Sequence, residues 1–142
     1  MTPIITRCAT IEYDEKFDAL FLNYTDKVNS HKEFIELNQK LLETFQNLDT
    51  QYVVADIRKI GIIGVDSQKW ASEVLFPAMV DHLDGKTLYH IQLLNKKDIY
   101  SAISGNNVKR FTTDIKGLEF YQVDDENEIA KHINYLREKE QS

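Results

Sequence analysis

Ser67 is the residue whose type and position are best suited to chemistry. It follows Asp66 in the run Asp66-Ser67-Gln68-Lys69, just before a predicted helix, so Asp66 or Ser67 is expected to cap that helix. Positive partial charge at a helix N-terminus favours a phosphate, and phosphorylation of Ser67 would change the local charge by about two units. Ser67 is therefore a candidate phosphorylation site or a helix cap, and both interpretations stay open.

Polar side chains follow two predicted strands at their carboxyl ends, where open α/β sheets bind ligands. Asp56 and Arg58 leave one strand, and Asn95 and Lys96 leave the next. The helix N-termini near Ser67 and Lys96 would add backbone donors for an anion. The alternative is structural: Arg58 pairs with a carboxylate, Asn95 caps a helix and Lys96 is solvated.

The loop between these features, residues 58–65, is unusually rich in branched apolar side chains. Ile62 and Ile63 lie at its centre. Clustered apolar area that stays exposed usually contacts another molecule, so this loop could meet a partner protein or an acyl chain. The same side chains could equally fold inward as a plug on the core.

No motif of a known catalytic or metal chemistry is found in the sequence. It contains no Gly-x-Ser-x-Gly turn, no phosphate-binding glycine loop and no Cys–His pair. The four histidines have no metal-ligand spacing; they are His31, His82, His90 and His132. We therefore predict no catalytic residue, no metal site and no cofactor.

Charge and cysteine content narrow the class of partner. The formal net charge of −6 gives no broad attraction for nucleic acid. The lone Cys8 cannot form an internal disulfide, which is typical of a reducing compartment, and we expect its thiol to be buried. We see no signal peptide and no apolar run of about 18 residues that would span a bilayer. The expected location is the cytoplasm, without an integral membrane segment.

The elements that would position these residues follow from hydrophobic periodicity. Alternation or short apolar runs predict five strands, at residues 9–13, 19–24, 52–57, 87–94 and 117–123. Apolar side chains spaced three and four apart predict four helices, at residues 30–48, from about 66 to 82, from 95 to about 105, and from about 124 onward. Pro77 lies inside the second helix and predicts a kink near 73–76.

The resulting order, β-β-α-β-α-β-α-β-α, predicts an α/β fold. We expect a mainly parallel five-stranded sheet, an N-terminal antiparallel hairpin strand at one edge, and about four helices. The 142 residues form a single domain, with a core from about 9 to 137. The hairpin at the sheet edge and the apolar loop each permit a weak homodimer.

Several short runs resemble the STAS domains, and more closely the small SpoIIAA-like proteins that share a fold with CRAL-TRIO lipid-binding domains. The residues that carry the resemblance are Val53-Val54-Ala55-Asp56-Ile57-Arg58, Val65-Asp66-Ser67-Gln68-Lys69-Trp70, Phe76-Pro77 and Glu128-Ile129-Ala130. The serine that is phosphorylated in the sporulation antagonists corresponds to Gln68 here, with Ser67 before it. The resemblance implies protein–protein regulation or binding of a lipid-like ligand.

The sequence thus predicts a non-enzymatic, cytoplasmic regulatory or protein-interaction domain. The alternative is a small-molecule or lipid-binding module of CRAL-TRIO type. The candidate ligand or partner site comprises Asp56, Arg58, Ile62, Ile63, Asp66, Asn95 and Lys96. A ligand carrier should have a cavity of a few hundred Å³, whereas a partner-binding domain should show a shallow apolar patch around residues 60–65.

Overall fold

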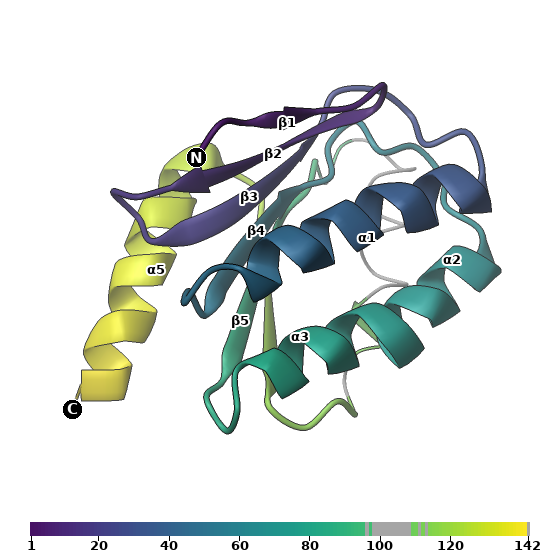
Figure 1. The fold of residues 1–142 in the computed structure, drawn as a ribbon. Coiled ribbons are helices and arrows are strands. Elements are labelled where there is room, and N and C mark those ends of the chain that lie inside the picture. Colours follow the sequence, from purple (N-terminus) through teal and green to yellow (C-terminus); the bar gives the residue numbers. More distant parts are fainter. Residues whose placement is uncertain (96, 98–108, 111, 113, 142) are drawn as a thin grey trace.

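A mixed six-stranded sheet with helices on both faces forms the fold (Figure 1). The computed structural model describes residues 1–95, 97, 109–110, 112 and 114–141. The strands are β1 (Ile4–Ile5), β2 (Ala9–Asp14), β3 (Ala19–Tyr24), β4 (Tyr52–Asp56), β5 (Leu88–Leu93) and β6 (Leu118–Val123), and they lie in that order across the sheet. The helices are α1 (His31–Gln46), α2 (Val65–Trp70), the π-helical turn η1 (Ala71–Leu75), α3 (Phe76–His82) and α5 (Glu126–Gln141).

The predicted α/β class is confirmed, but the sheet differs in detail. It has six strands instead of five, because β1 pairs with β2 at the hairpin edge. Both β1–β2 and β2–β3 are antiparallel, whereas the pairs from β3 to β6 are parallel, so the sheet is mixed. A two-residue strand is too short to show a period of two, so no pattern in the sequence predicted β1.

The helix count also differs from the expected four. The helices with both ends in the described residues form three runs, because α2, η1 and α3 are continuous from residue 65 to 82. Lys109, Arg110 and Thr112 are helical as well. The helix expected between residues 95 and 105 falls outside the described residues, apart from Asn95 and Lys97. None of the helices in the described chain is long and apolar enough to cross a bilayer.

The parallel register brings three strand ends to one edge of the sheet. Asn23 of β3 lies beside Asp56 of β4, and Asp56 lies beside Leu93 of β5. Helices α1, α2 and α3 cover one face of the sheet, and α5 covers the other (Figure 1). The sheet therefore separates two apolar clusters, and side chains at its carboxyl edge can face either of them.

Side chains fix the start of α1. The Ser30 hydroxyl accepts the Glu33 N–H at 3.1 Å. The Glu33 carboxylate accepts the Asn29 N–H and forms a two-pronged ion pair with Arg7, with both contacts at 2.6 Å. The Arg7 hydrogen bond lowers the pKa of Glu33 to about 2. These contacts tie the N-terminal segment to the first turn of α1.

The perturbation expected at Pro77 takes the form of a π-helical turn. Pro77 cannot donate a backbone hydrogen bond, and the Phe76 N–H bonds to the carbonyl of Ala71, five residues earlier. The wider turn still directs Ala71, Leu75 and Phe76 into the core, where all three are buried. Half-buried Trp70 meets the Phe34 ring edge-on at 6.2 Å and packs against the core.

Candidate functional site

The apolar loop after β4 is divided between the core and the surface. Ile60 and Ile63 are buried, whereas Ile62 is 61% exposed and Val65 is 59% exposed. Gly61 has a φ of +76°, a left-handed conformation that turns the chain between Ile60 and Ile62. Of the two candidate residues Ile62 and Ile63, only Ile62 can meet another molecule in this conformation.

A hollow of about 190 Å³ lies beside Ile62, where the first turns of α1 and α2 approach each other. Polar groups of Asn29, Ser30 and His31 line it together with Asp66. The Ile62 surface is our name for five residues that line this hollow, together with the exposed Val65 that follows Gly64; the five are Asn29, Ser30, His31, Ile62 and Asp66. This surface combines two exposed apolar side chains with both hydrogen-bond donors and hydrogen-bond acceptors.

Ser67 does not cap the helix, contrary to one of the two interpretations of the sequence. The N-cap is Gly64, so Asp66 and Ser67 lie inside the first turn of α2. Ser67 is only 3% exposed, and its hydroxyl lies 2.9 Å from Nδ1 of His31. A phosphate on Ser67 would therefore require this contact to open. The capping residue was missed because glycine satisfies no helical N–H with a side chain.

Ser67, His31 and Asp66 resemble a nucleophile, a base and a carboxylate in type, but not in arrangement. Nδ1 of His31 lies 2.9 Å from the Ser67 hydroxyl and 3.8 Å from a carboxylate oxygen of Asp66. Acyl transfer by such a triad uses the two different ring nitrogens, one for the hydroxyl and one for the carboxylate. The observed geometry uses one nitrogen for both, which suits a structural hydrogen bond.

At the carboxyl edge of the sheet, Asp56 and Arg58 form the ion pair that the structural alternative anticipated. Nε and Nη2 of Arg58 donate to the two Asp56 oxygens at 2.9 and 2.7 Å, and Nη2 also contacts Glu126. The hydrogen bond to Asp56 raises the pKa of Arg58 above its ordinary value. The side chain of Asn95 accepts the N–H of Lys97, and the candidate Lys96 lies outside the described residues.

A cavity of about 380 Å³ opens beside this ion pair, on the α5 side of the sheet. Its apolar lining comes mainly from the hairpin, the sheet and α5, and its polar lining from the strand ends and the first residue of α5. The lining residues are Phe17, Phe21, Asn23, Val54, Asp56, Leu93, Glu126, Ile129 and Ala130. The structure thus brings Asp56 to this cavity, but it places the Ile62 surface on the opposite side of the sheet.

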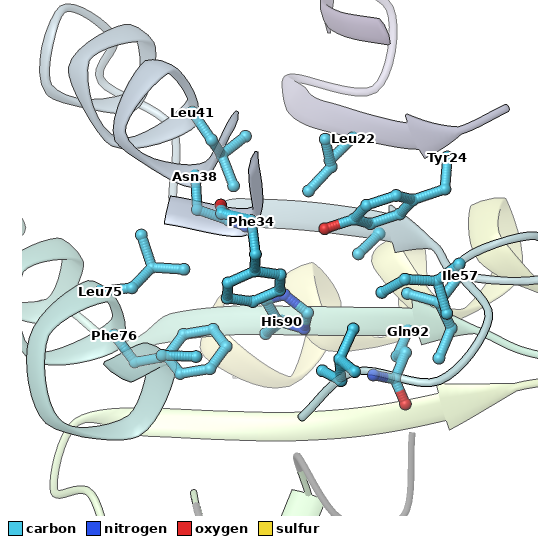
Figure 2. A pocket seen from close by; sticks show the side chains of 14 residues that line it. Leu22, Tyr24, Phe34, Asn38, Leu41, Ile57, Leu75, Phe76, His90 and Gln92 are labelled. Atoms are coloured by element: carbon cyan, nitrogen blue, oxygen red, sulfur yellow. Dashed lines mark hydrogen bonds between the residues drawn. The ribbon is translucent and has the colours of Figure 1, made fainter. Parts of the chain in front are cut away.

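A second, interior cavity of about 40 Å³ lies between the sheet and the helices α1 and α2–α3 (Figure 2). Every side chain that lines it is at least nine-tenths buried. The lining residues are Leu22, Tyr24, Phe34, Asn38, Leu41, Ala55, Ile57, Ile60, Ile63, Ala71, Leu75, Phe76, His90 and Gln92. The inward-facing residues of the apolar loop, Ile60 and Ile63, form part of its wall.

His90 is the most unusual residue of the interior cavity. Its Nδ1 is buried and has no hydrogen-bond partner in the described chain. The ring stacks on Phe120 at 4.9 Å and meets the edge of Phe76 at 5.1 Å. Burial lowers the pKa of His90 to about 4, so the ring is neutral at pH 7.

Sequence reasoning missed this cavity, although β5 carries a signal for it. All six residues of β5 are buried, yet His90 and Gln92 are polar and lie two apart, on the same face of the strand. Polar residues at i and i+2 in a fully buried strand indicate an internal polar site or a space that they line. Nε2 of His82, by contrast, has a partner, because it lies 2.9 Å from the carbonyl oxygen of Leu48.

The other titratable groups of the described residues add no further site. Cys8 is buried, and burial raises the pKa of its thiol, as expected for a structural cysteine. No group of three or more His, Cys, Asp or Glu side chains in the described residues could hold a metal ion.

Comparisons of the chain with protein-family models, curated proteins and solved structures found no match. The resemblance to STAS domains therefore stays a prediction.

Proposed function

We propose that this protein is a non-enzymatic binding domain that recognises a partner protein in the cytoplasm through the Ile62 surface. The observation that carries the proposal is the exposure of Ile62 in the wall of the 190 Å³ hollow, with the exposed Val65 three residues further along the chain. Neighbouring exposed apolar side chains with polar groups around them are typical of contact surfaces. The resemblance to STAS domains, which implies partner binding, is in line with this role.

The loop that carries Ile62 is anchored on both sides, so the exposed side chains are held in place. The carbonyl of Ile60 accepts the Val28 N–H at 3.2 Å. The carbonyl of Ile63 accepts the buried side-chain amide of Gln68 at 3.0 Å. Because these contacts prevent the loop from folding Ile62 inward, the surface pays little conformational entropy when a partner binds.

The partner should offer an apolar side chain to Ile62 and Val65, and hydrogen-bonding groups to the hollow. His31 and Asp66 provide a donor or acceptor and a carboxylate there. A short, exposed segment of another protein with an apolar residue beside polar ones meets both requirements. Such a contact needs no catalytic group.

Ile62→Asp tests this proposal, with Val74→Asp as the matched control. Val74 is also exposed, at 46%, but it lies on η1 and does not line the hollow. In pull-downs from the native host, we expect the wild type and Val74→Asp to retain a common protein that Ile62→Asp retains at least about tenfold less. Equal retention by all three would contradict the proposal, provided their thermal unfolding is the same.

A second candidate function, binding of a small lipid-like molecule, is favoured by the 380 Å³ cavity. Its volume lies within the usual range for ligand pockets, and its walls are largely apolar. Native mass spectrometry of the purified protein should then show an excess mass on the order of a few hundred daltons that denaturation removes. Ala130→Phe, which fills the cavity, should lose that excess, and a wild type without it would contradict this function.

A further inference from the structure

The interior cavity differs from the two surface sites because nothing in its wall is charged. Its fourteen lining residues in the described chain are apolar or neutral, and all are buried. Figure 2 shows Tyr24, Asn38, His90 and Gln92 reaching toward it from three elements, β3, α1 and β5. We propose that this cavity binds a small uncharged molecule with a short apolar body and one polar end, a hydroxyl or a primary amide.

Two of the four polar side chains in the cavity wall already interact with the backbone or with each other. The Asn38 amide donates to the Phe34 carbonyl at 2.9 Å. Burial raises the pKa of Tyr24, and the neighbouring Asn38 amide lowers it in part. Tyr24 and Asn38 therefore close one end of the cavity and leave the polar end of a ligand to His90 and Gln92.

His90 offers a hydrogen-bond acceptor or donor that the described part of the chain does not use. A neutral imidazole has one nitrogen of each kind, and Nδ1 has no partner in the described residues. A buried polar atom without a partner carries an uncompensated desolvation cost. A hydroxyl or amide of a bound molecule would remove that cost.

Gln92 supplies the complementary group beside His90. Its side-chain oxygen accepts the Gln122 amide at 2.8 Å, and its own amide nitrogen is a hydrogen-bond donor in the cavity wall. Because His90 and Gln92 are two residues apart on β5, their side chains leave the same face of the sheet. A ligand end that both donates and accepts fits this pair, whereas a charged end would have no counter-ion there.

The volume limits the ligand to a few heavy atoms. A cavity of about 40 Å³ compares with the roughly 10–15 Å³ that one water needs, so it suits a molecule of about four heavy atoms. Water alone would satisfy His90 and Gln92, but apolar walls such as Ile57 and Ile60 would leave further waters without partners. A larger molecule would have to displace Ile60 and Ile63, the loop residues that close the cavity.

The experiment uses 2-propanol and acetamide as hydroxyl and amide probes, and xenon as a probe without a polar end. Each is titrated into the full-length protein while backbone amide and His90 ring ¹⁵N shifts are recorded. We expect saturable shifts of the lining residues with Kd on the order of 10 mM for the two polar probes. Ala71→Leu, which fills the cavity, should weaken their binding at least about tenfold, whereas Ala78→Leu, outside the lining, should not.

His90→Phe keeps the aromatic stacking and tests the polar contact if Ala71→Leu does not fold. It should weaken the polar probes at least about tenfold and leave xenon binding unchanged. Shifts that never saturate, or that persist in Ala71→Leu, would overturn the proposal. Binding of xenon alone would also overturn it, because it would identify the cavity as an apolar void.

Discussion

At the scale of single residues, His90 combines burial, two aromatic contacts and a nitrogen without a partner. Its pKa is about 4 in the folded protein, against an ordinary value of 6.5. Above pH 6.5 the ring is neutral in both the folded and unfolded states, and folding costs no deprotonation. Below pH 6.5, the His90 ring of the unfolded chain takes up a proton that the buried ring of the folded chain excludes. Acid should therefore favour unfolding.

We predict that the free energy of unfolding falls by about 3 kcal/mol between pH 6.5 and 4 through His90 alone. Urea unfolding across that range, compared for the wild type and His90→Phe, measures the effect. The difference in the free energy of unfolding between the wild type and His90→Phe should shrink or reverse as the pH rises to 7. A His31→Gln control should keep the pH dependence of the wild type. The same slope in His90→Phe and wild type would contradict the prediction.

At the scale of elements, the sequence predicted what depends on local pattern. The spacing of apolar residues from Phe34 to Phe45 defined α1, and the continuous apolar run at Val53 and Val54 defined a strand buried on both faces. The direction of the side chains in the loop after β4 could not be predicted. Whether Ile62 or Ile63 faces the core depends on the left-handed Gly61 and on distant hydrogen bonds. Contacts of that kind leave no period in the sequence.

The contacts of the candidate site residues also divide into those that the local sequence predicts and those that only packing creates. The pairing of Arg58 with a carboxylate followed from charge and proximity in the chain, since Asp56 is two residues away. The contact between His31 and Ser67 joins residues 36 apart, and only the packing of α1 against α2 creates it. The interior cavity is likewise a result of packing, so only the polar residues of β5 hinted at it.

The anchoring of the apolar loop predicts a specific effect of Gln68→Met. The buried amide of Gln68 holds the Ile63 carbonyl, and methionine has a similar size without the donor. We expect a loss of about 1–3 kcal/mol in the free energy of unfolding, and faster hydrogen exchange of the amides of residues 60–64. Gln46→Met on the exposed side of α1 is the control and should change stability by less than about 0.5 kcal/mol. Unchanged exchange in the loop would count against this anchoring.

At the scale of the whole molecule, the sheet divides the core into two clusters that are held in different ways. One lies under α1 and α2–α3, and the other lies under α5 alone among the described helices. Arginines hold α5 near its two ends: Arg58 contacts Glu126 at the carboxyl edge, and Arg137 bonds to the carbonyls of Phe17 and Asp18. The C-terminal helix and the N-terminal hairpin are therefore joined directly.

This arrangement predicts that Arg137→Gln loosens one side of the molecule before the other. The change removes the hydrogen bonds to the hairpin and the stacking of the guanidinium over Tyr52 at 4.7 Å. We expect a loss of about 1–2 kcal/mol in stability, with faster hydrogen exchange in α5 and the hairpin but not in α1. Lys131→Gln, at an exposed position of α5, should leave both the stability and the hydrogen exchange unchanged. If hydrogen exchange in Arg137→Gln became equally faster in α1 and α5, the two clusters would instead unfold as one unit.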